Sequence, residues 1–201
     1  MENRRKLAYH HVIFGPMFSG KTREMQKIYS REKSRKRKIQ VFKKYIDKRF
    51  KGIRSHDGVK FDDKDVFIAK DADDIERQLH DDTEIIMIDE AQFYSKKLVE
   101  KIREWVEERG ITVITTVLPT DYRGETFGIA GDLLAQADKH TPLTAICEYG
   151  DGKCNNPATR SFRKARSKKR ILIGGHEAYV PMCRQHFAES MRLRGKNRGT
   201  A

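Results

Sequence analysis

The sequence predicts an α/β fold in which a parallel β-sheet is flanked by helices and followed by a small C-terminal domain. Apolar strand-like runs alternate with helix-like segments through the first two thirds of the chain. The run at 84–89 (EIIMID) holds four consecutive apolar residues, as a central parallel strand does. From Cys147 onward the chain is rich in glycine, cysteine and charge, with too few apolar residues for a large second core.

The first half of the chain divides into elements by the spacing of its apolar residues. A short apolar run is followed by Met25, Ile28 and Tyr29 at helical spacing. A later polar, charged segment contains glycine and is typical of a mobile loop. The expected elements are a strand at 11–14, a helix at 22–38, a strand at 39–43, a loop at 44–65 and a short helix at 72–80.

The second half continues the alternation as far as the first cysteine. Leu98, Ile102, Trp105 and Val106 form a helical stripe, and Gly110 stands where a glycine commonly ends a helix. The residues after it are β-branched, which favours a strand. The expected elements are a strand at 84–89, a helix ending before Gly110, a strand at 111–118, a helix at 128–137 and the end of another strand at 144–147.

Length and composition indicate a soluble, cytoplasmic protein. The 201 residues suffice for one full domain with a small appendage. The chain has no stretch of ~20 apolar residues that could span a bilayer, and the charged start at 1–5 precedes no apolar run typical of a secretory signal. Three cysteines, an odd number, do not suggest a disulfide framework. We expect no membrane partner.

The net charge of +13 is concentrated in three segments rather than spread over the fold. Residues 31–38 carry six basic side chains and one acid, 160–170 carry seven basic side chains, and 192–201 carry four. Such runs are usually solvated, although they also attract anionic nucleotides. We therefore expect an exposed helix end, a loop and a disordered basic tail, and do not expect nucleic acid as a partner.

The segment from Gly15 to Thr22 (GPMFSGKT) fits the phosphate-binding pattern G-x-x-x-x-G-K-[ST]. Backbone N–H groups of such a loop wrap a phosphate, and the following helix presents the positive end of its dipole. In this pattern Lys21 reaches the β- and γ-phosphates and the Thr22 hydroxyl binds Mg²⁺. Because the predicted flanks are a strand and a helix, the context supports binding of a nucleoside triphosphate rather than a chance match.

An acid pair, Asp89 and Glu90, ends the apolar run at 84–89. Ligands of α/β sheets bind outside the carboxyl ends of the strands, where the phosphate loop also begins. Asp89 therefore suits a Mg²⁺ ligand, and Glu90 suits a base for the group that attacks the γ-phosphorus. The alternative is a pair of exposed acids with no chemical role.

Four residues near the end of the chain form a candidate metal site: Cys147, Cys154, Cys183 and His186. The second pair has the spacing of a metal knuckle, whereas six residues separate the first two cysteines, more than the usual two to four. Four ligands leave no open position, so a structural Zn²⁺ is the expected occupant. The alternative is three buried cysteines and a surface histidine, and His176 is a spare ligand.

Together these motifs resemble those of the type II thymidine kinase family, the cytosolic kind with a zinc-braced lasso. The resemblance covers about residues 8–189. It rests on GPMFSGKT (15–22), DKR (47–49), SHDG (55–58), IDEAQFY (88–94), DYRGETFG (121–128), LTAIC (143–147) and GGHEAYVPMCRQH (174–186). Members of the family usually have two intervening residues in the first metal pair, where this chain has six.

The resemblance implies a P-loop (RecA-like) kinase core at 1–143, a zinc-binding lasso domain at 144–191 and a basic tail at 192–201. It implies transfer of the γ-phosphoryl group of ATP to the 5′-hydroxyl of thymidine, with deoxyuridine as a further candidate substrate. It also implies Mg²⁺, a structural Zn²⁺, feedback by thymidine triphosphate (dTTP) and a homotetramer.

The resemblance also assigns roles to single residues. Glu90 is the implied catalytic base, and Thr22 and Asp89 the implied magnesium ligands. Asp47 and Arg49 are expected on the phosphate side of the site. The implied ATP-phosphate loop is Gly15, Pro16, Met17, Phe18, Ser19, Gly20, Lys21 and Thr22. The implied nucleoside pocket is Met17, Phe93, Leu118, Tyr122, Phe127, Ile171, Ile173 and Tyr179.

Two other functions compete with a nucleoside kinase. A nucleic-acid-dependent ATPase is suggested by the DEAQ sequence at 89–92, but such motors need a second core domain for which 201 residues leave no room. A zinc-containing nucleic-acid-binding module is suggested by the positive charge and would bind DNA or RNA with a steep salt dependence. Such a module would not explain the presence of the phosphate loop or of Glu90.

Overall fold

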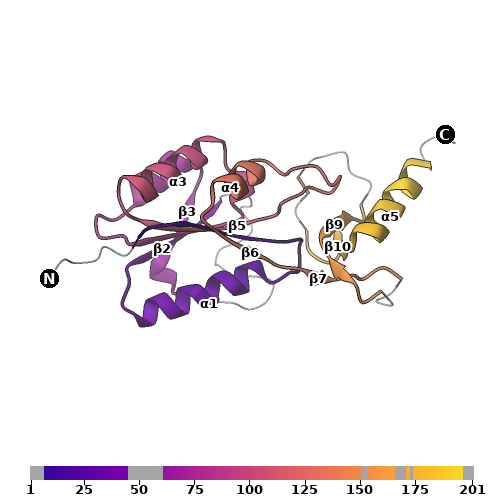
Figure 1. Cartoon of the computed structure of the whole chain (residues 1–201), viewed down its shortest axis with the longest axis horizontal. Coiled ribbons are helices and arrows are strands. Elements are labelled where there is room, and N and C mark those ends of the chain that lie inside the picture. The colour runs from indigo at the N-terminus through magenta and orange to yellow at the C-terminus, as the bar shows by residue number, and fades with distance from the viewer. Residues whose placement is uncertain (1–6, 45–60, 151–153, 166–170, 173, 197–201) are drawn as a thin grey trace.

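The computed structural model of the chain describes residues 7–44, 61–150, 154–165, 171, 172 and 174–196. Within these residues a parallel sheet lies between layers of helices, and a smaller domain extends from one end of it (Figure 1). The predicted α/β class is confirmed. None of the described helices combines the length and apolar character needed to cross a membrane.

Six strands of the described residues form the central sheet, in the order β3-β2-β4-β5-β1-β6, and every neighbouring pair is parallel. All carboxyl ends therefore meet at one edge. β5 separates β1 from β4, so the segments that follow β1 and β4 leave the same edge on either side of β5. The strands are β1 His10–Phe14, β2 Ile39–Lys44, β3 Val66–Ala69, β4 Ile85–Asp89, β5 Thr112–Val117 and β6 Lys139–Pro142.

Successive residues of the buried strands face opposite helical layers. Ile86 and Ile88 of β4 pack in one cluster, and Ile85 and Met87 pack in another. Helix α1 lies over one face, and α3 and α4 lie over the other (Figure 1). The helical segments of the core are α1 Lys21–Ser34, η1 Asp63–Asp65, α2 Ala72–Gln78, η2 Ala91–Phe93, α3 Lys97–Glu107 and α4 Ala130–Gln136.

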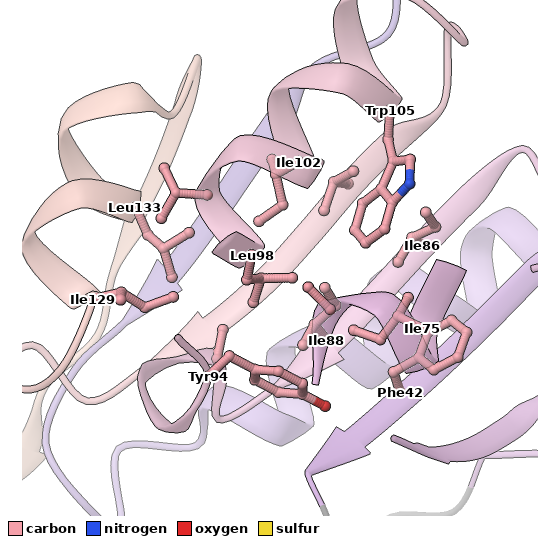
Figure 2. Packing of buried hydrophobic residues seen from close by; sticks show 14 of the residues in the cluster. Phe42, Ile75, Ile86, Ile88, Tyr94, Leu98, Ile102, Trp105, Ile129 and Leu133 are labelled. Atoms are coloured by element: carbon pink, nitrogen blue, oxygen red, sulfur yellow. The ribbon is translucent and has the colours of Figure 1, made fainter. Parts of the chain in front are cut away.

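The larger cluster is built on the predicted stripe of α3. Leu98, Ile102 and Trp105 point from α3 toward the strands, and Leu133 approaches from α4 (Figure 2). The Trp105 side chain is fully buried, and its indole N–H donates to Glu76 Oε2 at 2.7 Å. This hydrogen bond joins α3 to α2, so the one polar atom of the indole keeps a partner inside the core.

The smaller domain has little apolar core. β7 Ala145–Ile146 pairs antiparallel with β8 Pro157–Ala158, and β9 Arg160–Arg163 pairs antiparallel with β10 Tyr179–Met182. Helix α5, Arg184–Lys196, follows. The buried residues that hold these elements together are Cys147, Ala158, Val180, Met182, Cys183 and Phe187.

Several predicted boundaries are wrong. α1 ends at Ser34 instead of residue 38, and Lys36 adopts the left-handed conformation with φ 60°. β7, Ala145–Ile146, lies within the strand end expected at 144–147, but it pairs with β8 and does not join the central sheet, whose edge strand here is β6. β6 was missed because it is a short, mostly exposed edge strand, and edge strands lack the apolar signal of central ones.

Two basic segments also differ from their predictions. Residues 160–163 form β9 rather than a loop, because Ser161 and Arg163 are buried against the rest of the molecule. α5 runs to Lys196, so the first five residues of the expected disordered tail are helical.

Most of the loop expected at 44–65 lies outside the described residues, while 63–65 form η1 and β3 follows it.

Burial of His10 predicts a loss of stability in acid. His10 is 3 % exposed, and desolvation lowers its pKa to about 4, with Asp138 opposing the shift. The unfolded chain, with a histidine pKa near 6.5, therefore binds more protons between pH 6.5 and 4. Stability is full above about pH 6.5 and falls toward pH 4, by at most about 3 kcal/mol from this residue.

We expect His10→Asn to flatten the pH dependence of the free energy of unfolding between pH 4 and 6.5, measured by urea denaturation. His80→Gln, at an exposed histidine, is the matched control and should leave the slope unchanged. An unchanged slope in His10→Asn would show that the protonation of His10 does not limit acid stability.

Candidate active site and metal centre

The phosphate loop connects the end of β1 to the start of α1, as predicted. Gly20 precedes the helix with φ 80°, a left-handed conformation that glycine adopts without strain. At Gly15 a Cβ atom would lie 2.4 Å from the carbonyl oxygen of Leu143, so no side chain fits there. Gly20 is therefore required by a left-handed turn and Gly15 by a close approach to another backbone segment. The sequence motif alone did not distinguish these two roles.

Residues of the small domain hold the phosphate loop from one side. The Met17 N–H donates to Ser161 Oγ of β9 at 2.9 Å. The Phe18 ring stacks on the His176 ring, with the centroids 3.7 Å apart and the planes 18° from parallel. The loop conformation is therefore coupled to the folding of the small domain, although more than 140 residues separate Met17 from Ser161 in sequence.

Lys21 closes the loop upon itself. Its Nζ donates to the carbonyl oxygen of Pro16 at 2.7 Å. Burial lowers the pKa of Lys21 to about 8, and the charges of Glu90 and Asp89 oppose this shift. The ammonium group is thus close enough to both acids to feel their charge. The phosphate-loop pattern predicts that this lysine reaches a phosphate.

Asp89 lies at the carboxyl end of β4 among three partners. Its carboxylate is 3.4 Å (Oδ1) and 3.5 Å (Oδ2) from Thr22 Oγ1. Lys43 Nζ is 3.5 Å from Oδ2, and the Thr116 hydroxyl donates to Oδ1 at 2.5 Å. The hydroxyl and carboxylate expected to bind Mg²⁺ are therefore together. Hard oxygen donors of this kind, on the side where phosphates bind, fit that ion.

Glu90 directly follows Asp89 and leaves the strand in a left-handed conformation, with φ 53° and ψ 47°. Such angles are uncommon for a residue other than glycine and often occur at functional sites. Glu90 is exposed as a residue, yet the protein atoms around its carboxyl group desolvate that group. Desolvation and the nearby Asp89 charge raise the pKa to about 7, while Lys21 and Lys43 oppose the shift.

A cavity of about 570 Å³ adjoins the phosphate loop. Its volume lies within the range of small-molecule sites. It lies beside the first turns of α1, so a nucleotide bound by the loop could extend into it. The lining residues are Phe18, Ser19, Gly20, Arg23, Glu24, Lys27 and Leu143.

The expected nucleoside residues lie in two contacting groups. In one, Phe93 meets Phe127 edge to face with centroids 5.3 Å apart, and the Leu118 N–H donates to the Gln92 side chain at 3.0 Å. Leu118 and Phe127 are buried. This group follows the ends of β4 and β5, at the same edge as the acid pair.

The second group forms around Arg163, whose side chain is 1 % exposed. The guanidinium carbon lies 3.4 Å from the centroid of the Tyr122 ring and 5.7 Å from that of Tyr179, distances typical of cation–π contacts. The Tyr179 hydroxyl donates to the carbonyl oxygen of Leu172 at 2.8 Å. β9 therefore connects Tyr122 and Tyr179 through Arg163 and reaches Met17 through Ser161.

Four expected residues are not placed in this site. Ile171 is 47 % exposed. Asp47, Arg49 and Ile173 lie outside the described residues.

Sequence reasoning missed Lys43, Thr116, Ser161 and Arg163. Lys43 pairs in register with Asp89 across β2 and β4, so a polar residue at the end of a neighbouring parallel strand was the available signal. Thr116 offered a similar signal at the end of β5. Nothing in the sequence indicated that Ser161 and Arg163 contact the core domain.

The four predicted metal ligands converge in the small domain. Their ligand atoms all lie within 4.8 Å of one another, and His186 Nδ1 is 3.6 Å from Cys147 Sγ and 3.4 Å from Cys183 Sγ. A tetrahedral zinc ion with bonds of about 2.0–2.3 Å separates its ligand atoms by roughly 3.5–3.8 Å. The cluster fits Zn²⁺, and it includes Cys154 despite the six residues that separate it from Cys147.

Neighbouring groups orient these ligands. The Tyr149 ring stacks on the His186 ring with the centroids 4.1 Å apart. Burial raises the pKa of Cys147, whereas the backbone N–H of Asn156 is the main cause that lowers the pKa of Cys154. Zinc binding favours the thiolate form, so an ion at this cluster would reverse the effect of burial on Cys147.

The metal site can be tested by comparing the two histidines of this region. His186→Ala should lower the zinc content of the purified protein well below one equivalent and lower the unfolding temperature, because a ligand is lost. His176→Ala removes a histidine that lies outside the cluster and should retain the metal. Elemental analysis decides, and equal zinc content in both variants would contradict the ligand assignment.

Comparison with known proteins places the chain in a family. A family model described as "Thymidine kinase" matches residues 8–187. A thymidine kinase of Bdellovibrio bacteriovorus is 38 % identical over 178 residues, which cover 88 % of this chain and 83 % of that protein. One from Thermococcus kodakarensis is 37 % identical over 188 residues, which cover 87 % of this chain and 91 % of that protein. The match includes the phosphate loop, the acid pair and the metal cluster, and the chain belongs to the thymidine kinase family.

Proposed function

We propose that the protein is an ATP-dependent thymidine kinase that converts thymidine to its 5′-monophosphate. One observation carries the proposal beyond family membership. The phosphate loop residues Lys21 and Thr22 and the acids Asp89 and Glu90 meet at one edge of the sheet. Aromatic side chains follow the same strand ends. Phosphoryl transfer requires this combination of anion binding, charge neutralisation and a base.

In the proposed reaction Glu90 accepts the proton of the thymidine 5′-hydroxyl as its oxygen attacks the γ-phosphorus of ATP. The bond from the γ-phosphorus to the β–γ bridging oxygen breaks, and ADP leaves. A carboxyl group with a pKa near 7 is matched to proton transfer at neutral pH. Lys21 and the loop N–H groups hold the phosphates in line, and they neutralise the charge that spreads over the transferred group.

Mg²⁺ would be held by Thr22 and Asp89, and it would supply positive charge to neutralise the phosphates. Lys43, 3.5 Å from Asp89, adds a further positive charge to the same edge. Asp47 and Arg49 stay a prediction for the phosphate side.

We infer that residues 144–191 act as a zinc-braced nucleoside-binding domain and residues 1–143 as the kinase core. The contacts of Ser161 with Met17 and of Arg163 with Tyr122 support this division of roles. The small domain has few buried apolar residues, and a structural Zn²⁺ would supply stability that its core does not. Ile171, Ile173 and Tyr179 are proposed as the part of the pocket that this domain contributes.

Some parts of the proposal rest on the family alone. These are a homotetrameric assembly, feedback inhibition by dTTP and use of deoxyuridine. A cytoplasmic location is proposed from the composition of the chain.

The reaction itself is tested by incubating the protein with labelled ATP, Mg²⁺ and a panel of nucleosides. We expect label in thymidine monophosphate, with deoxyuridine as the next-best acceptor, because the proposed nucleoside residues are aromatic and apolar. A parallel sample with single-stranded DNA and no nucleoside separates the competing functions. ATP hydrolysis stimulated by DNA, with no labelled nucleotide, would support a nucleic-acid-dependent ATPase and overturn the kinase proposal.

Replacement of the proposed base gives a second test. Glu90→Gln keeps the size of the side chain but cannot accept the proton, so we expect kcat to fall about 10²–10⁴-fold. The affinities for ATP and thymidine, measured by calorimetry, should change little. Glu107→Gln, at an exposed acid on α3 and away from the strand ends, is the control. Near wild-type kcat in Glu90→Gln would remove this residue from the mechanism.

A further inference from the structure

Thr116 lies behind the acid pair and is not explained by core packing. It is the penultimate residue of β5, its side chain is fully buried, and it carries a hydroxyl where an apolar side chain would fill the same space. A buried hydroxyl is costly unless it is hydrogen-bonded. The partners of Thr116 therefore indicate what the hydroxyl does.

Both hydrogen-bonding capacities of the Thr116 hydroxyl are directed at the acid pair. The hydroxyl donates to Asp89 Oδ1 at 2.5 Å, and it accepts the backbone N–H of Glu90 at 2.9 Å. An ionised carboxylate only accepts and an N–H only donates, so Thr116 must donate to Asp89 and accept from Glu90. One side chain thus fixes the carboxylate orientation of Asp89 and the backbone position of Glu90.

The sheet register explains why Thr116 reaches both residues. Ile88 of β4 is paired with Thr115 of β5, so Asp89 and Thr116 are the next residues along the two parallel strands. Ile114 and Met87, two positions earlier, pack in the cluster covered by α1, so Thr116 and Asp89 face the same layer. Thr22 lies at the start of α1, the helix that covers this layer, and its Oγ1 atom is 3.4 Å from Asp89 Oδ1.

The bond to Glu90 acts where the backbone leaves its regular path. β4 ends at Asp89 and the chain turns into a left-handed conformation at Glu90, so the Glu90 N–H lies past the last residue of the strand. The Thr116 hydroxyl supplies the acceptor for that N–H. The hydrogen bond to Thr116 of β5 therefore fixes the backbone position from which the Glu90 side chain extends.

We propose that Thr116 is a positioning residue of the phosphoryl-transfer site. It orients Asp89 toward Thr22 and the magnesium position, and it holds the turn from which Glu90 reaches the nucleoside hydroxyl. The inference rests on the proposed kinase function and deepens it. Thr116 does not touch substrate; it acts through the two acids. Partners behind metal ligands commonly change metal affinity or activity 10–100-fold when they are removed.

The test compares three variants of β5. Thr116→Val removes the hydroxyl and keeps the shape, and Thr116→Ser keeps the hydroxyl and removes a methyl group. Thr115→Val is the matched control, because Thr115 is equally buried on the same strand but bonds to His10 on the opposite face. Any general effect of a hydroxyl loss in this strand should appear in both valine variants.

We expect Thr116→Val to lower kcat about 10–100-fold with a change of less than about threefold in the KM for thymidine. Thr116→Ser should recover most of kcat, and Thr115→Val should keep it. Binding of Mn²⁺ in the presence of ADP, measured by calorimetry, should weaken about 10-fold or more in Thr116→Val alone. The unfolding temperature of each variant separates stability loss from these effects.

The proposal is overturned if Thr116→Val retains the wild-type kcat and Mn²⁺ affinity. It is also overturned if Thr115→Val loses both to the same degree, or if Thr116→Ser is as impaired as Thr116→Val. If wild-type protein does not phosphorylate thymidine, the kinase proposal fails by itself. The Mn²⁺ measurement then still decides whether Thr116 orients Asp89.

Discussion

The parallel alignment of β1, β5 and β4 is the constraint on which the rest of the structure depends. It brings the carboxyl ends of these strands to one edge, so the phosphate loop after β1 and the acid pair at the end of β4 meet across β5. Neither segment can form the site alone, because one supplies positive charge and backbone donors and the other supplies the carboxylates. β5 provides more than spacing, since Thr116 contacts both acids.

The small domain contacts the core although it has few buried apolar residues of its own. It contacts the phosphate loop through Ser161 and Tyr122 through Arg163, yet its elements are too short to bury a large core. Three cysteines and a histidine converge there, and a metal ion held by them would join the segments of this domain where apolar burial is small. β9, held within that domain, carries Ser161 and Arg163 to the core domain. A change in the metal centre is therefore expected to affect both the loop and the pocket.

The sequence predicted the central elements well because their signals are local. The phosphate loop depends on glycines and a lysine at fixed spacing, and the buried strand before Asp89 is apolar on both faces. The strands β6 and β9 were missed because their residues are mostly polar or charged, and β3 was missed because its apolar run is only four residues long. Pairing partners far along the chain make these segments strands. The left-handed turn at Glu90 likewise has no local glycine to signal it.

The sequence by itself determined the chemistry that is available: the phosphate loop, the acid pair, the four metal ligands and the resemblance to a kinase family. The tertiary structure decided how these groups act on one another. Only folding could place Cys154 beside Cys147, Lys43 beside Asp89 and His176 against Phe18. The physical reason is that residue types and spacing are properties of neighbours in sequence, whereas the site arises from strand register and from contacts between segments far apart in the chain.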